Sequence, residues 1–144
     1  MGSSSGARAL DTASYTLTVS KDPRFLQTVY DLTAKTAELL GCHARAAVAL
    51  TDAVQLIVEA IVGARVQPSG AGLIDVRFEA DPETLRVEIA VEPPAGHRPG
   101  WTVETALVER RQLDALRRLM PDAEFVTRGQ WHICRLLCTL SPRP

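Results

Sequence analysis

The sequence predicts an α/β fold of the α+β kind: a two-layer sandwich in which three helices cover one mixed, mostly antiparallel sheet. Apolar and polar residues alternate strictly, with the period of half-buried strands, in residues 15–20, 74–78 and 85–91. Longer segments between them carry apolar residues at helical spacing. The resulting order is strand, helix, helix, strand, strand, helix, strand, strand. This order favours strands that share a single covering layer of helices.

The predicted helices have recognisable ends. Asp22 and Pro23 begin the first helix as its N-cap and first helical residue, and Gly41 ends it. A second helix, over about 44–64, is apolar around most of its circumference, which is typical of a helix buried in the middle of a domain. A third helix is expected over about 103–120, directly before a proline.

The remaining strands pair as hairpins. Residues 81–83 form the turn between the second and third strands, and Gly129 joins the last two strands, 124–128 and 130–140. The sheet face that points away from the helices should be partly exposed, because it carries the charged residues Asp75, Arg77, Glu79, Arg86 and Glu88.

The length of 144 residues is typical of one domain. We expect this domain to span 14–140, after a disordered or tag-derived segment 1–13 and before a short tail 141–144. Sixteen Lys and Arg against 17 Asp and Glu give a net charge of −1, which provides no cationic excess for binding nucleic acid or a membrane. Three cysteines, an odd number, argue against a secreted disulfide framework and predict a cytoplasmic protein.

The cysteines and histidines do not form a predicted catalytic or metal site. Cys134 and Cys138 are four residues apart on a predicted strand, about 13 Å, which is too far for a disulfide or a shared zinc ion. We therefore interpret both as core residues. Cys42 and His43 are adjacent, but adjacency alone does not make a catalytic dyad.

Two charged surfaces are candidates for binding a partner. Arg45, Asp52 and Glu59 recur every seven residues on the second helix, with Gln55 beside them, and form either a solvated strip or the wall of a cleft. The third helix carries a local cationic patch, either a solvated face or a docking site for an acidic partner. Its residues are Arg110, Arg111, Arg117 and Arg118.

The order of elements, together with residues 48–60, resembles the GHKL (histidine-kinase-like) ATPase domain of bacterial anti-sigma factor serine kinases, over about residues 14–140. The resemblance implies that Asp52 stands where the family has its general base, a glutamate. It also places Leu56 where the family has a Mg²⁺-binding asparagine, and a leucine cannot coordinate this cation.

Two further nucleotide motifs of that family are altered. The resemblance implies that Glu92 and Gly96 occupy the adenine-binding motif, where two prolines follow Glu92, remove backbone donors and fix φ. The glycine-rich lid of the family corresponds to residues 103–107, which contain no glycine. A protein with these three changes is expected to have lost robust ATP chemistry.

The resemblance therefore implies a degenerate serine-kinase fold: an anti-sigma-factor-like regulator that acts by partner switching. Its partners would be a sigma factor, a STAS-type anti-anti-sigma factor, or both, with a possible homodimer and no cofactor. One alternative is an active ATP-dependent serine kinase of an anti-anti-sigma factor, which uses ATP and Mg²⁺, with Asp52 as base and Glu92 at the adenine. A second is an adaptor unrelated to sigma factors.

Overall fold

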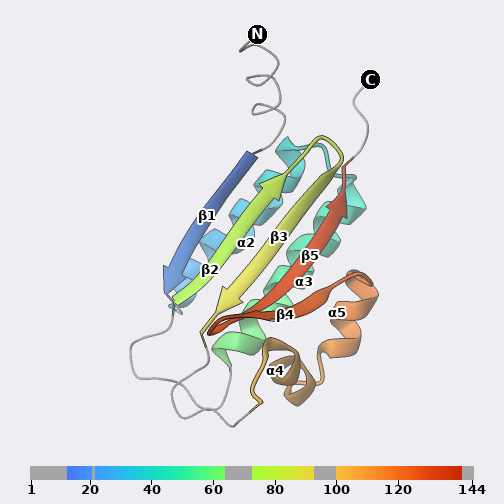
Figure 1. The fold of residues 1–144 in the computed structure, drawn as a ribbon. Helices are drawn as coiled ribbons and strands as arrows, with labels where there is room; N and C mark the ends of the chain where they lie inside the picture. Colours follow the sequence, from blue (N-terminus) through green and yellow to red (C-terminus); the bar gives the residue numbers. More distant parts are fainter. Residues whose placement is uncertain (1–12, 21, 64–72, 93–99, 141–144) are drawn as a thin grey trace.

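A computed structural model of the protein describes residues 13–20, 22–63, 73–92 and 100–140. Within these residues the chain forms one antiparallel sheet of five strands, in the order β1-β2-β3-β5-β4, and four helices on one face of it (Figure 1). The elements are β1 (Ala13–Ser20), α2 (Pro23–Leu39), α3 (Ala44–Val62), β2 (Leu73–Ala80), β3 (Thr84–Val91), α4 (Val103–Glu109), α5 (Leu113–Leu119), β4 (Glu124–Arg128) and β5 (Trp131–Thr139). The predicted α+β class and its two layers are confirmed.

The strand register places apolar residues in rows across the sheet. Val76 lies opposite Leu17 of β1 and Ile89 of β3, and Ile89 in turn lies opposite Cys134 of β5. Because side chains alternate between the two faces of a strand, this row faces the helices while its neighbours in the sequence face away. The fully buried Val76, Ile89 and Cys134 show that the core lies between sheet and helices.

Helix α3 is the central helix of the covering layer, as its apolar circumference predicts. It contacts α2 on one side, α4 and α5 on the other, and strands β3 and β5 beneath it. Its buried residues are Leu50, Ala53, Val54, Ile57, Val58, Ala60 and Ile61. A helix held this firmly on its inner side is a rigid support for whatever its remaining face presents.

The predicted ends of α2 and the predicted hairpin turn are present. The Asp22 side chain accepts from the Arg24 guanidinium and from the Arg24 amide. These contacts, the guanidinium first, lower the pKa of the Asp22 carboxyl from 3.8 to about 2. Gly41, at φ 85°, ends α2 in a Schellman motif. Between β2 and β3, Asp81 Oδ1 accepts from the amides of Glu83 and Thr84 at 2.8 and 2.7 Å.

Two details of the predicted fold are wrong. The predicted third helix over 103–120 is two helices in the described chain, α4 and α5, so four helices are present there instead of three. The break lies at Arg111, whose φ is 59°. The Gln112 amide donates to the Leu107 carbonyl at 2.9 Å and the Arg111 amide to Val108 at 3.0 Å, which is the Schellman pattern of Gly41 without a glycine. The second detail is the sheet, whose described pairings are all antiparallel and not mixed.

Arg111→Gly is expected to raise the free energy of unfolding by about 0.5 to 1 kcal/mol. A non-glycine residue with left-handed backbone costs about 1 kcal/mol, and glycine removes that cost while adding some chain entropy to the unfolded state. Ala115→Gly, inside α5, is the control and should lower the same quantity by about 1 kcal/mol. Urea denaturation measures both, and an Arg111→Gly variant that is less stable than the parent would show that Arg111 is not strained.

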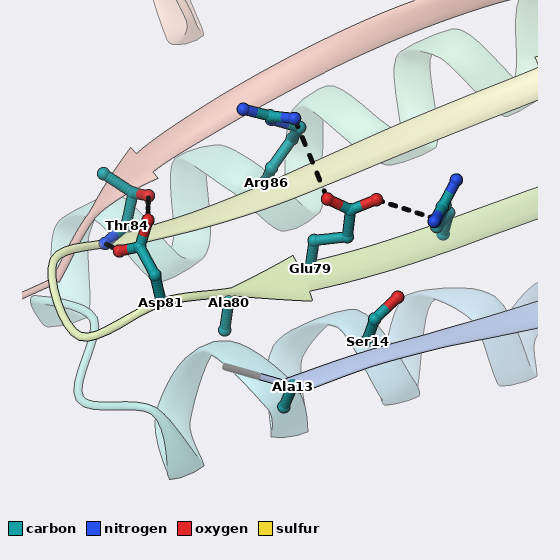
Figure 2. A pocket seen from close by; sticks show the side chains of 8 residues that line it. Ala13, Ser14, Glu79, Ala80, Asp81, Thr84 and Arg86 are labelled. Carbon is teal, nitrogen blue, oxygen red and sulfur yellow. Dashed lines mark hydrogen bonds and ion pairs between the residues drawn. The ribbon is translucent and has the colours of Figure 1, made fainter. Parts of the chain in front are cut away.

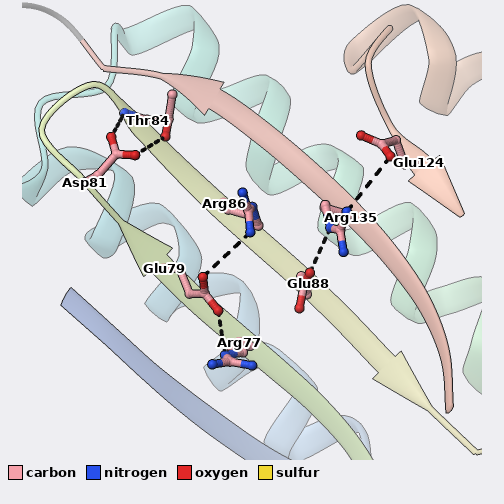
Figure 3. Close-up of polar contacts among 8 residues, drawn as sticks. All are labelled: Arg77, Glu79, Asp81, Thr84, Arg86, Glu88, Glu124 and Arg135. Carbon is pink, nitrogen blue, oxygen red and sulfur yellow. Dashed lines mark hydrogen bonds and ion pairs between the residues drawn. The ribbon is translucent and has the colours of Figure 1, made fainter. Parts of the chain in front are cut away.

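The face of the sheet away from the helices carries a ladder of ion pairs (Figure 3). Glu79 lies between Arg77, at 2.8 Å, and Arg86, at 3.7 Å. Farther along the sheet, Arg135 Nε donates to Glu88 Oε2 at 2.8 Å, and Arg135 also lies 4.0 Å from Glu124. The predicted partial exposure of this face is confirmed, since Arg77 and Arg86 are exposed whereas Glu88 is only 5% exposed.

Candidate functional site

A cleft of about 470 Å³ lies between α3 and α5, and we refer to it as the α3–α5 cleft. Helix α3 contributes one side of its lining and α5 the other. The lining residues are Asp52, Gln55, Leu56, Glu59, Ala115, Arg118 and Leu119. The cleft therefore brings together residues that the sequence singles out in different contexts, namely Asp52, Gln55, Leu56 and Glu59 of α3 and Arg118 of α5.

The helical period explains why four residues of α3 share this cleft. Asp52, Gln55, Leu56 and Glu59 are spaced i, i+3, i+4 and i+7, so they lie on one face of the helix. Ile57, next in the sequence to Leu56, points into the core and is fully buried. Leu56 itself is only half-buried, because its side chain faces the cleft.

The turn at Arg111 sets the position of the opposite wall. It redirects the chain so that α5 packs on α3 through its buried Leu116 while Ala115, Arg118 and Leu119 line the cleft. An ion pair between Arg117 and Glu104, at 3.3 Å, joins α5 to α4. Ala115, Arg118 and Leu119 are a second i, i+3, i+4 set, this time on α5.

The cleft has an apolar floor and a charged rim. Leu56, Ala115 and Leu119 supply the apolar surface. On the rim, Gln55 Nε2 donates to Glu59 Oε1 at 3.0 Å, whereas Asp52 has no hydrogen-bond partner in the part of the chain that the structure describes. Two carboxylates and one guanidinium give these described lining residues a net charge of −1.

The residues of the cleft do not fit a magnesium–nucleotide complex. Leu56 presents hydrocarbon one turn from Asp52, and Mg²⁺ binds oxygen ligands. The net negative lining also disfavours a triphosphate, because like charges repel each other. Among the described residues, no group of three or more His, Cys, Asp or Glu is placed to hold a metal ion. The arrangement is better suited to an apolar side chain with a polar or cationic neighbour.

The other predicted nucleotide-site residues lie away from this cleft or outside the described chain. Glu92 follows β3, is exposed, and does not belong to the described lining of the cleft. Gly96 lies outside the described residues. Residues 103–107 are helical in α4, where Thr102 and Thr105 form a capping box and Leu107 is buried. This segment is therefore a packed helix and does not have the form of a glycine-rich lid over a nucleotide.

The four arginines of the predicted cationic patch have different neighbours. Arg118 lines the cleft, Arg117 pairs with Glu104, and Arg111 occupies the strained turn. The Arg110 guanidinium lies over Gly63, the C-cap of α3, so closely that a β-carbon there would overlap its Nη1 atom. Arg110 thus stands near the negative end of the α3 dipole, where a cation is stabilised.

A second pocket lies on the open face of the sheet, beside the β2–β3 turn, and encloses about 310 Å³ (Figure 2). It is lined by Ala13, Ser14, Arg77, Glu79, Ala80, Asp81, Thr84 and Arg86. Its charged groups already bind one another, since Glu79 pairs with both arginines and Asp81 caps the turn. For this reason we place the candidate functional site in the α3–α5 cleft.

The comparisons with known proteins assign no family to this chain. A scan against protein-family models finds no match, and no curated protein matches it. No helix among the described residues is long and apolar enough to cross a membrane.

Proposed function

We propose that this protein is a regulatory binding protein that acts by partner switching, in the manner of an anti-sigma factor, from a GHKL-like fold whose ATP site is lost. The observation that carries the proposal is the lining of the α3–α5 cleft. The resemblance places nucleotide chemistry at α3, which forms one side of this cleft. There Leu56 of α3 and Leu119 of α5 form an apolar floor, and the described lining residues carry a net charge of −1. This surface accommodates a protein side chain better than Mg²⁺ and ATP.

The proposed partners are a sigma factor, a STAS-type anti-anti-sigma factor, or both, in the cytoplasm. Partner switching requires that two proteins compete for overlapping surfaces, so that binding of one shifts the population away from the other. A cleft between two short stretches of helix is compatible with such competition, because two partners that each insert a side chain there exclude each other.

The edge of the sheet offers a place for the possible homodimer. Strand β1 pairs only with β2 among the described strands, so its outer backbone groups have no strand partner there. Its sequence, ASYTLTVS, has no charge and no proline, the usual devices that keep an edge strand from pairing. A second copy can therefore add its own β1 antiparallel to this edge, which satisfies the symmetry of a two-fold dimer.

The test compares two leucine-to-arginine variants as bait in a native extract of the source organism. Leu56→Arg places a cation in the cleft, while Leu137→Arg makes the same change at an exposed position on the opposite face of the sheet. Parent and Leu137→Arg should retain a sigma factor or a STAS-domain protein, identified by mass spectrometry. Leu56→Arg should retain at least tenfold less of this partner than the parent does. Its melting temperature should stay within about 3 °C of that of the parent.

Other outcomes contradict the proposal in distinct ways. Equal retention by Leu56→Arg moves the interface away from the cleft. Retention of proteins with no relation to sigma factors favours the adaptor alternative. Transfer of phosphate from ATP to a serine of the retained protein favours the active kinase, with Asp52 as its base.

A further inference from the structure

Two cysteines that are 96 residues apart in the sequence meet at one end of the sheet. The Sγ atoms of Cys42 and Cys138 lie 3.4 Å apart, and both thiols are free. Cys42 is in the turn between α2 and α3, and Cys138 is near the end of β5. The sequence gives no indication of this contact, because it arises only when the turn packs against the last strand.

The backbone holds both cysteines in place. The Schellman motif that ends α2 fixes Cys42, whose amide donates to the Ala37 carbonyl at 2.9 Å. Cys42 also forms a β-bridge with Leu140, two residues beyond Cys138. The Leu140 amide in turn donates to the Glu83 carbonyl at 2.7 Å. The close approach of the two sulfurs is thus a consequence of two hydrogen-bonded segments and not of two mobile side chains.

The two thiols differ in access. Cys42 is partly exposed, whereas Cys138 is 4% exposed. Burial, and secondarily the contact with Cys138, raises the pKa of the Cys42 thiol to about 12. Cys42 is therefore a thiol at neutral pH, which makes it a slow nucleophile and a poor metal ligand.

We propose that Cys42 and Cys138 form an oxidisable dithiol site that reacts with low-molecular-weight disulfides and closes to an intramolecular disulfide. The sulfurs need to approach by about 1.4 Å to reach the bond length of about 2.0 Å. Because the accessible Cys42 meets the reagent first, the buried Cys138 is the resolving thiol.

The chemistry balances as two thiol–disulfide exchanges. The small fraction of Cys42 that is deprotonated attacks one sulfur of glutathione disulfide as the thiolate, forms a protein–glutathione disulfide, and expels one glutathione thiolate. Cys138, as thiolate, then attacks the Cys42 sulfur, forms the Cys42–Cys138 bond and expels the second glutathione thiolate. The protein loses two protons and two electrons, and glutathione disulfide gains them as two molecules of glutathione.

The disulfide would join the start of α3 to the last strand. Ala44, the first residue of α3, lies two positions after Cys42, so the bond would tie the helix that lines the α3–α5 cleft to β5. The bond would also close a loop of nearly a hundred residues, which restricts the unfolded chain strongly. We expect the melting temperature to rise by about 5 to 15 °C on oxidation.

The test equilibrates the whole protein in glutathione buffers, from fully reduced to fully oxidised, for long enough to allow a slow reaction. The expected result is a mass loss of two hydrogens per chain and the rise in melting temperature. Cys134→Ala is the matched control, since Cys134 is equally buried on the same strand and should leave both changes intact. Cys42→Ala should abolish both.

Cys138→Ala separates the two exchange steps. With no resolving thiol, the variant should hold one glutathione, on Cys42, and show no rise in melting temperature. Three results with the parent protein would overturn the proposal: no loss of two hydrogens at full oxidation, a disulfide that involves Cys134, or covalent dimers in place of the intramolecular bond. Retention of the disulfide by Cys138→Ala would overturn it equally.

Discussion

Ile57→Ala is expected to lower the free energy of unfolding by about 2 to 5 kcal/mol, whereas Leu56→Ala should lower it by less than about 1.5 kcal/mol. Ile57 is fully buried on the inner face of α3, so truncation leaves a cavity in addition to the lost apolar burial. Leu56 is half-buried and lines the cleft, so its truncation widens a space that is already open to solvent.

Urea denaturation of the two variants measures this contrast directly. Both residues are aliphatic, adjacent, and in the middle of the same helix, so their helix propensities change in a similar way. Equal losses of stability would show that Leu56 is a core residue and that the α3–α5 cleft is closed in solution.

Arg135→Met is expected to lower the free energy of unfolding by about 2 to 3 kcal/mol. The substitution leaves the Glu88 carboxylate at 5% exposure without the guanidinium that now donates to it at 2.8 Å (Figure 3). A buried charge without its partner is costly, and the partial exposure of Arg135 keeps the effect below that of a fully buried pair.

The double variant Glu88→Leu with Arg135→Met is the control for this explanation. It removes both charges, and replacing a buried ion pair by apolar groups is often neutral or stabilising. We expect it to recover at least half of the stability lost in Arg135→Met, measured by the same urea denaturation. A double variant that is less stable than the single one would show that the ion pair itself stabilises the sheet.

The parts of the fold that could be predicted from sequence depend on residues whose type strongly favours one local backbone structure. Asp22 and Pro23 begin α2, Gly41 ends it, and the strict alternation in β2 and β3 defines the hairpin. The break at Arg111 could not be predicted in this way, because arginine has no preference for the left-handed backbone it adopts. Packing of α4 and α5 against α3 holds Arg111 in this conformation, which a non-glycine residue ordinarily avoids.

Only the α3 side of the candidate site could be predicted from the sequence. The polar stripe with Asp52 and Glu59 was apparent from the period of α3, and a cleft wall was one of its two interpretations. Ala115 and Leu119 were missed, because their direction depends on the turn at Arg111. The contact between Cys42 and Cys138 was missed for a related reason: it joins distant segments through packing alone.

Titration calorimetry of the purified protein with ATP and Mg²⁺ tests the central claim most directly, namely that this fold serves partner binding without ATP chemistry. The cleft lined by Leu56 and a net negative rim predicts no measurable heat of binding at ATP concentrations up to about 1 mM, where even weak sites of about −4 kcal/mol become half-occupied. Micromolar binding of ATP, accompanied by phosphate transfer to a serine of a copurifying partner, would contradict the claim and identify the protein as an active kinase.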